Sequence, residues 1–203
     1  RRITKTGSPI REVFEHHKIA ISSSNVLEVL GLTKDSYFLA SIHRQENVDF
    51  PDRLKSIYDG LQALSSEFER RVLVSTHPRT KLRLQELGLT DLDSVEFHPP
   101  FGYLDYARLQ LDSFCVVSDS GTISEESAIM GFNAVTLRDS MERPEALVTG
   151  SIMLTGLETE SLIRAVNLSQ ESTAMSLPEG YEVEDFSERV IRFLFSTVSL
   201  SAS

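Results

Sequence analysis

The sequence predicts an α/β fold, namely a Rossmann-like, doubly wound parallel sheet with helices on both faces. Two observations lead to this prediction. Strand-like apolar runs alternate with helical patterns along the whole chain, and this alternation is typical of parallel strands joined by helical crossovers. Polar residues of functional types gather directly after several of these strands, where ligands bind to doubly wound sheets. Neither an internal repeat nor a second core is evident, so residues 1–203 are expected to form a single domain.

The first half of the chain opens with a helical lead-in at residues 8–32, where Ser24 or Asn25 is the expected cap of a short helix over 26–30. Runs of branched and aromatic residues then predict strands, and apolar residues spaced by three and four predict helices. The strands are expected at 36–42, 71–75 and 94–97, and the helices at 50–68, 80–87 and 103–111. Gly88 is expected to end the second of these helices, because glycine readily adopts the left-handed conformation found there.

The second half continues the alternation. Strands are expected at 114–117, 133–137 and 151–154, and helices at 122–130, 142–148, 157–168 and 185–198. Gly131 is the expected end of the first of these helices, and Pro144 lies in the first turn of the second, where proline is tolerated. Residues 170–180, rich in Ser, Pro, Gly and Glu, predict a surface connector, and residues 199–203 a disordered tail.

The composition indicates a globular protein that does not bind nucleic acid. The 203 residues are 40% hydrophobic and carry a net charge of −10 without a Lys/Arg block, which argues against a nucleic-acid partner. The single cysteine, Cys115, excludes a disulfide within the chain and fits a reducing, cytoplasmic location. No apolar run is long enough to span a membrane. The chain begins at Arg1 without an initiator Met or a signal peptide, which indicates a piece of a longer protein.

The stretch from Ser118 to Glu126 is the most informative motif. A buried strand ends there in a turn of small residues that leads into a helix, and the N–H groups at such a helix start can bind phosphate. Ser120 and Gly121 are the candidate phosphate contacts, and Glu126, deeper in the helix, can reach a ribose diol. The alternative is that Ser118, Asp119 and Ser120 only cap the helix. The glycine-rich fingerprints of dinucleotide-binding proteins and P-loops are both absent from the sequence.

Two further motifs follow predicted strands. The run from His43 to Asn47 contains a histidine, which can exchange a proton near neutral pH, and Arg44, which can bind a phosphate or carboxylate. The weaker motif His77-Pro78-Arg79 ends the next strand at the same edge. An ordinary surface loop is the alternative for each. The five histidines lack metal-ligand spacing, so no metal site is expected.

A last motif, from Arg138 to Glu145, follows the strand expected at 133–137. Arg143 can supply a cation for the phosphates. A solvated loop with internal ion pairs is the alternative.

Taken in order, these motifs resemble the non-hydrolysing UDP-N-acetylglucosamine 2-epimerases. The motifs are HRQEN, THP, SDSGTISEE and RDSMERPEA, and the resemblance extends from about Lys5 to about Leu168. It covers the C-terminal half of that family's proteins, which are similar to two-domain glycosyltransferase-B folds with the active site between two Rossmann-like domains. It therefore implies that this chain is one half of such a fold and that the N-terminal domain is absent.

The resemblance implies a mechanism that needs neither NAD nor a metal. Such enzymes remove the C2 proton of the sugar, eliminate UDP to give a 2-acetamidoglycal, and add UDP back with the proton on the other face. His43 matches the family's active-site histidine. The remaining matched positions bind UDP or a second, regulatory UDP-sugar: Ser120 and Gly121 contact the diphosphate, Glu126 the ribose, Arg143 phosphate, Tyr106 the uracil region, and Arg44 and His77 the regulatory molecule.

Departures from the family pattern leave the sugar open. Thr122 stands where a second glycine is more usual, and Gln45 replaces a common arginine. The motif variants look most like a subgroup acting on UDP-N-acetyl-L-talosamine, which yields UDP-N-acetyl-L-fucosamine for capsule or O-antigen, and plain UDP-N-acetylglucosamine epimerisation is the close competitor. A UDP-sugar glycosyltransferase and a non-catalytic UDP-binding module are the other hypotheses. Because the family's catalytic acids lie in the N-terminal domain, this chain alone is expected not to epimerise, and dimerisation is expected mainly through that missing half.

Overall fold

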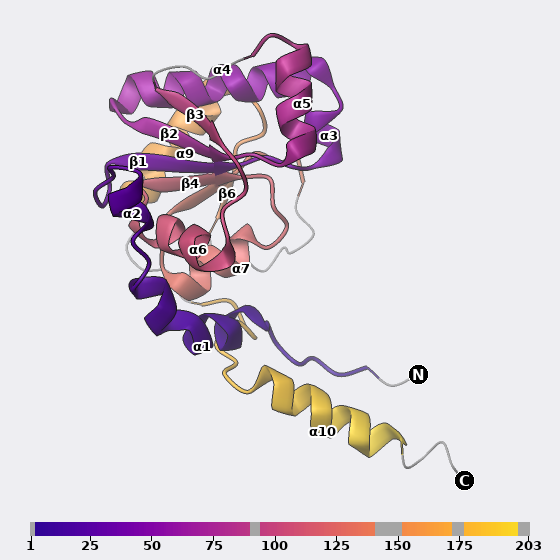
Figure 1. Ribbon diagram of the computed structural model, residues 1–203. Helices are drawn as coiled ribbons and strands as arrows, with labels where there is room; N and C mark the ends of the chain where they lie inside the picture. Colours follow the sequence, from indigo (N-terminus) through magenta and orange to yellow (C-terminus); the bar gives the residue numbers. More distant parts are fainter. Residues whose placement is uncertain (1–2, 90–93, 141–151, 172–176, 199–203) are drawn as a thin grey trace.

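The computed structural model describes residues 3–89, 94–140, 152–171 and 177–198. Within them, six strands form one parallel sheet in the order β3-β2-β1-β4-β5-β6 (Figure 1). The strands are β1 (Tyr37–Ser41), β2 (Arg71–Ser75), β3 (Val95–His98), β4 (Cys115–Ser118), β5 (Ala134–Thr136) and β6 (Met153–Leu154). This is the strand order of a Rossmann fold, so the predicted fold class is confirmed.

Helices cover both faces of the sheet. They are α1 (Ile10–Ser22), α2 (Val26–Val29), α3 (Gln45–Val48), α4 (Pro51–Phe68), α5 (Pro78–Glu86), α6 (Tyr103–Asp112), α7 (Ile123–Met130), α9 (Thr159–Glu171) and α10 (Phe186–Val198). On one face, α4 and α9 pack against the strands through Leu61 and Val166, among others. On the other face, α6 and α7 do so through Leu109 and Ile123. Helix α1 packs outside α6 and α7, one layer further from the sheet (Figure 1).

The predicted elements match the observed ones within a few residues, with two differences. The four-residue helix α3 lies where a polar loop was expected, because so short a helix leaves no apolar periodicity in the sequence. Helix α9 continues to Glu171, so the connector expected from residue 170 begins later. Gly131 ends α7 with a φ of 81°, as predicted. The helix predicted at 142–148 and the tail at 199–203 lie outside the described residues.

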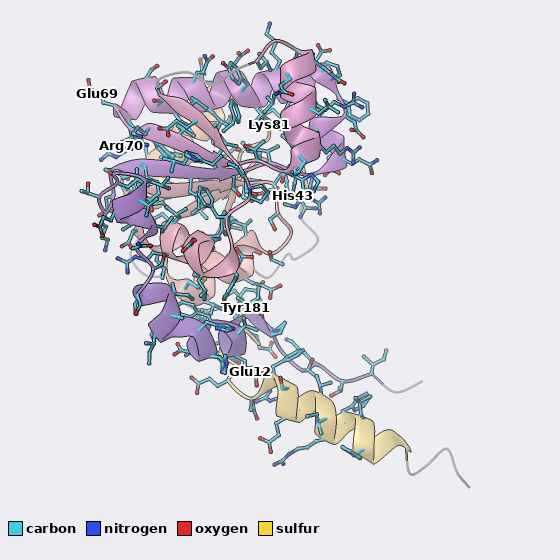
Figure 2. All side chains as sticks on the ribbon, in the orientation of Figure 1. Glu12, His43, Glu69, Arg70, Lys81 and Tyr181 are labelled. Atoms are coloured by element: carbon cyan, nitrogen blue, oxygen red, sulfur yellow. The ribbon has the colours of Figure 1, made fainter. Side chains whose placement is uncertain are left out.

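The carboxyl ends of the central strands are level with one another. Ser41 at the end of β1 pairs with Ser75 of β2 on one side and with Ser118 of β4 on the other. The chain crosses from β1 toward β2 and β3, and later from β4 toward β5 and β6, so the direction of winding reverses between β1 and β4. Ligands of doubly wound folds bind at this switch point. Figure 2 shows His43 at this edge, while Glu69 and Arg70 lie at the opposite one.

The two ends of the described chain run side by side before they leave the sheet domain. The N–H of Ser8 donates to the carbonyl of Gly180 over 3.0 Å. The carboxylate of Glu12 accepts hydrogen bonds from the N–H and hydroxyl of Ser187, at 2.9 and 2.8 Å, at the start of α10. Beyond this contact α10 extends away from the sheet (Figure 1) and exposes Ile191, Leu194 and Phe195.

Candidate functional site at the switch point of the sheet

The turn between β4 and α7 is closed by its own side chains. Ser118 Oγ accepts a hydrogen bond from the N–H of Ser120 at 3.1 Å, and Ser120 Oγ accepts one from the N–H of Thr122 at 3.3 Å. Thr122 is the cap residue of α7 but makes no side-chain cap bond. Ser118 and Ser120 therefore stabilise the turn before α7 and do not cap the helix itself.

A cavity of about 410 Å³ opens beside this turn, at the carboxyl edge of the sheet. Its lining residues are Ser41, His43, Ser75, Phe101, Tyr103, Tyr106, Ser118, Ser120 and Glu126. This volume lies within the usual range for small-molecule sites. Four predicted site residues are brought together here, namely His43, Tyr106, Ser120 and Glu126, and Gly121 directly follows Ser120 in the chain. Arg143 lies outside the described residues.

The carboxylate of Glu126 lines one side of this cavity. It accepts hydrogen bonds from Gln110 Nε2 at 2.7 Å and from Thr122 Oγ1 at 2.6 Å. Burial, together with the negative charge of Glu126, raises the pKa of both Tyr103 and Tyr106. The two phenols therefore stay neutral near pH 7 and can donate or accept hydrogen bonds. The arrangement suits a ligand with hydroxyl groups and a planar ring.

His43 reaches the cavity from the loop after β1. Its side chain is 48% exposed, and its Nδ1 lies 3.3 Å from Oδ1 of Asp119. The Asp119 side chain is completely buried, and it accepts hydrogen bonds from the N–H groups of His43 and Arg44 and from Asn47 Nδ2. The backbone of His43 is thus hydrogen-bonded to Asp119 at the end of β4, and its ring lies beside the same carboxylate.

Arg44 and His77 lie at the same edge but do not line the cavity. The Arg44 side chain pairs with Glu46 at 2.9 Å, and this hydrogen bond lowers the pKa of the Glu46 carboxyl. His77 caps α5, where its Nδ1 accepts the N–H of Arg79 at 3.3 Å. The structure therefore separates these two residues from the cavity of His43 and Ser120.

Glu125 and Glu126 are adjacent in the sequence, but their carboxylates line different cavities. The Glu125 carboxylate accepts a hydrogen bond from the hydroxyl of Ser8, and it lines a second hollow of about 350 Å³ beside the segment around Gly180. Successive residues on a helix point about 100° apart, so only one of the two carboxylates can face the switch-point cavity.

The sequence analysis missed several lining residues and the role of Asp119. Ser41 and Ser75 are the last residues of β1 and β2, and Phe101 lies just before α6. Their strand-end positions are the signal that could have identified them. Among the described residues, no group of three His, Cys, Asp or Glu side chains is arranged to hold a metal ion. No helix in the same ranges has the length and apolarity needed to cross a bilayer.

Comparisons with known proteins identify the family of the chain. The profile of the family described as UDP-N-acetylglucosamine 2-epimerase matches residues 1–195. The chain belongs to this family. A UDP-N-acetylglucosamine 2-epimerase of Methanocaldococcus jannaschii is 37% identical over 157 residues, which are 74% of this chain and 43% of that protein. A UDP-2,3-diacetamido-2,3-dideoxy-D-glucuronate 2-epimerase of Pseudomonas aeruginosa is 31% identical and covers 81% of this chain and 46% of that protein.

Solved structures of family members superimpose on this chain over about half of their own length. The M. jannaschii enzyme in complex with UDP-GlcNAc and UDP gives a TM-score of 0.86 at 31% identity, covering 94% of this chain and 54% of that one. The Neisseria meningitidis epimerase bound to UDP-GlcNAc gives 0.79 at 25% identity, covering 95% of this chain and 55% of that one. This member of the epimerase family thus spans about half the length of its relatives and has the fold of one half of their glycosyltransferase-B-like structures.

Proposed function

We propose that this chain is the C-terminal, UDP-binding half of a UDP-sugar 2-epimerase, folded as a single domain over residues 1–203. The observation that carries the proposal is the switch-point cavity, which gathers His43, Ser120 and Glu126, in a chain that superimposes on an epimerase complexed with UDP-GlcNAc and UDP. The reaction would be an isomerisation that inverts C2 of a UDP-2-acetamido sugar by elimination and re-addition of UDP.

Each residue has a role that its position supports. Ser120 and Gly121 lie in the turn before α7, where the N–H groups at a helix start favour a diphosphate. Glu126 faces the cavity and can accept hydrogen bonds from ribose hydroxyls, while Tyr106 borders the region assigned to uracil. His43 is the proton-transfer residue. Arg143 would add a cation to the diphosphate. Arg44 and His77, outside the cavity, are assigned to a second, regulatory UDP-sugar site.

The missing partner is the N-terminal half. The chain covers 43% of the curated M. jannaschii relative, so the other half of the cleft is expected from residues outside this sequence. The exposed face of α10, with Leu194 and Phe195, offers apolar surface on which that half can pack. Because the catalytic acids are assigned to that half, the chain alone would not epimerise. A homodimer of the longer protein would form mainly through the same half.

The sugar is defined only as a UDP-2-acetamido sugar. The relatives include enzymes named for UDP-N-acetylglucosamine and for UDP-2,3-diacetamido-2,3-dideoxy-D-glucuronate, so similar C-terminal halves serve different sugars. UDP-N-acetylglucosamine is the first candidate. UDP-N-acetyl-L-talosamine is the second, because the motif variants near His43 and Ser118 favour it. We place the enzyme in the cytoplasm, where its product would supply capsule or surface polysaccharide.

Two experiments test the proposal. The 203-residue chain is titrated with UDP and assayed for conversion of either UDP-sugar; binding without turnover is expected, and turnover by the chain alone would show that its inactivity was wrongly inferred. The protein that carries both halves is then incubated with UDP-sugar in deuterium oxide. A 2-epimerase exchanges the C2 hydrogen for deuterium, whereas a glycosyltransferase or a non-catalytic UDP-binding module does not.

A further inference from the structure

Asp119 does not line the cavity, but its buried carboxylate accepts several hydrogen bonds. It is fully buried at the end of β4 and is surrounded by hydrogen-bond donors of the segment after β1, namely the loop at His43 and Arg44 and the first turn of α3. The N–H of His43 lies 3.1 Å from Oδ1, the N–H of Arg44 lies 2.9 Å from Oδ2, and Asn47 Nδ2 lies 3.0 Å from Oδ2. Burying a carboxylate is costly unless such donors satisfy it, so these bonds hold the loop after β1 in one conformation.

The orientation of the Asn47 amide is fixed by its other contacts. Asn47 Oδ1 accepts hydrogen bonds from Arg53 Nε at 3.2 Å and Nη2 at 3.0 Å, and Arg53 also pairs with Asp139 at 2.8 Å. Arginine can only donate, so the oxygen of the amide must face it and the NH₂ must face Asp119. The Asp119 carboxylate is therefore an acceptor in each of these contacts.

A further neighbour of this carboxylate is the ring of His43, whose Nδ1 lies 3.3 Å from Oδ1. If Nδ1 carried no proton, two lone pairs would face each other at this distance. A proton on Nδ1 instead makes the contact attractive, and a small rotation of the half-exposed ring closes it to a hydrogen bond.

We propose that Asp119 is a positioning residue for His43. It holds the ring proton on Nδ1, so that Nε2 keeps its lone pair and can accept a proton from a group in the cavity. Asp119 itself does not touch the ligand. The catalytic role of His43 rests on the proposed epimerase function, but the position of the proton on its ring does not depend on that function.

The tautomer of His43 tests the proposal directly. NMR of the 203-residue chain with ¹⁵N-labelled histidine distinguishes a protonated from an unprotonated ring nitrogen, without any substrate. In the wild-type chain we expect the neutral ring to carry its proton on Nδ1. In Asp119→Asn, the new NH₂ group can face Nδ1 and favour the proton on Nε2. The tautomer ratio should shift by about tenfold, the factor that one ordinary hydrogen bond confers.

Asn47→Ala is the matched control. It removes one hydrogen bond to the same carboxylate but leaves the contact between Asp119 and the ring of His43. Asn47→Ala should lower stability without changing the tautomer ratio of His43. If Asp119 only stabilised the fold, the two substitutions would affect the tautomer ratio alike. A wild-type ring protonated mainly on Nε2 would overturn the proposal even if Asp119→Asn does not fold. An unchanged ratio in a folded Asp119→Asn chain would also overturn it.

A kinetic measurement separates this proposal from the proposed function. In the protein that carries both halves, Asp119→Asn should lower kcat by about 100-fold, the lower range for loss of a general base, with KM changed only a few-fold. Asn47→Ala should lose far less of kcat. Equal losses in the two variants would contradict the positioning role. If the wild-type protein fails to exchange the C2 hydrogen, the proposed function fails, while the tautomer measurement still decides the arrangement.

Discussion

Replacing Glu126 with Gln should remove recognition of the ribose while leaving the fold intact. The Glu126 carboxylate already accepts two hydrogen bonds, from Gln110 Nε2 at 2.7 Å and Thr122 Oγ1 at 2.6 Å. A carboxylate has about four acceptor positions, so about two remain for a ribose diol. The substitution turns one oxygen into a donor. The side-chain amide of Gln110 can flip to present its oxygen to this donor, so the cost in stability should be only about 1 kcal/mol.

The ligand has no such compensation. Hydrogen bonds to a charged group contribute about 1.5–3 kcal/mol, which corresponds to roughly a 10- to 150-fold weaker affinity for UDP. NMR titration measures this because it remains quantitative for weak ligands. Wild-type protein should bind UDP more tightly than 2′,3′-dideoxy-UDP by a similar factor, and Glu126→Gln should not discriminate between the two.

Glu125→Gln provides the matched control, since this adjacent carboxylate binds Ser8 rather than lining the switch-point cavity. It should reduce stability and keep the preference for UDP over the dideoxy analogue. The reasoning would be refuted if Glu126→Gln kept the full preference for the ribose hydroxyls, or if Glu125→Gln lost it.

Two further predictions concern stability. Gly7→Ala would place a Cβ 2.6 Å from a methyl group of Val183, at a φ of +93°. It should lower the free energy of unfolding, measured by urea denaturation, by about 3 kcal/mol. Gly88→Ala is the control, since Gly88 has a φ of +69° but nothing within 4 Å of the added Cβ, and it should lower the same free energy by only about 1 kcal/mol. The hydrogen bond from Arg71 lowers the pKa of Glu96 below its ordinary value of 4.5. The stability that Glu96 adds is therefore complete above that value and is lost as the pH falls through the lowered pKa. The difference in unfolding free energy between wild type and Glu96→Gln should be about 1 kcal/mol at pH 7 and should disappear as the pH falls through the lowered pKa. A difference that persists in acid would contradict this.

The fold could be predicted well because its signals are local. Each of the central strands is a short apolar run, and each long helix has a regular apolar face, so a window of a few residues suffices to recognise it. Because ligands bind where the strands of such a sheet end, the sequence also predicts that His43, Ser120 and Glu126 lie near one another. For Arg44 and His77 the same rule predicts the correct edge of the sheet, but it does not predict whether their side chains line the cavity. Whether a side chain at that edge enters the cavity depends on its rotamer and partner, and Arg44 is drawn to Glu46.

Asp119 shows what such local signals cannot reveal. Its hydrogen-bond partners lie 72 to 76 positions earlier in the chain, at the end of a different strand. In the sequence it is simply one more small polar residue in a turn. Only the pairing of β1 with β4 brings it under the backbone of His43 and Arg44.

The charge of the cavity bears on the proposal that this chain supplies one half of a UDP-binding cleft. Its described lining contains the carboxylate of Glu126 but no Lys or Arg side chain. A diphosphate brought beside that carboxylate would be repelled unless N–H groups and cations offset the charge. The first turn of α7, which begins at Ile123, supplies N–H groups, and Arg143 is the cation assigned from the sequence. On the proposed function, the missing half is the expected source of further positive charge, so UDP should bind more tightly to a protein that carries both halves than to this chain alone.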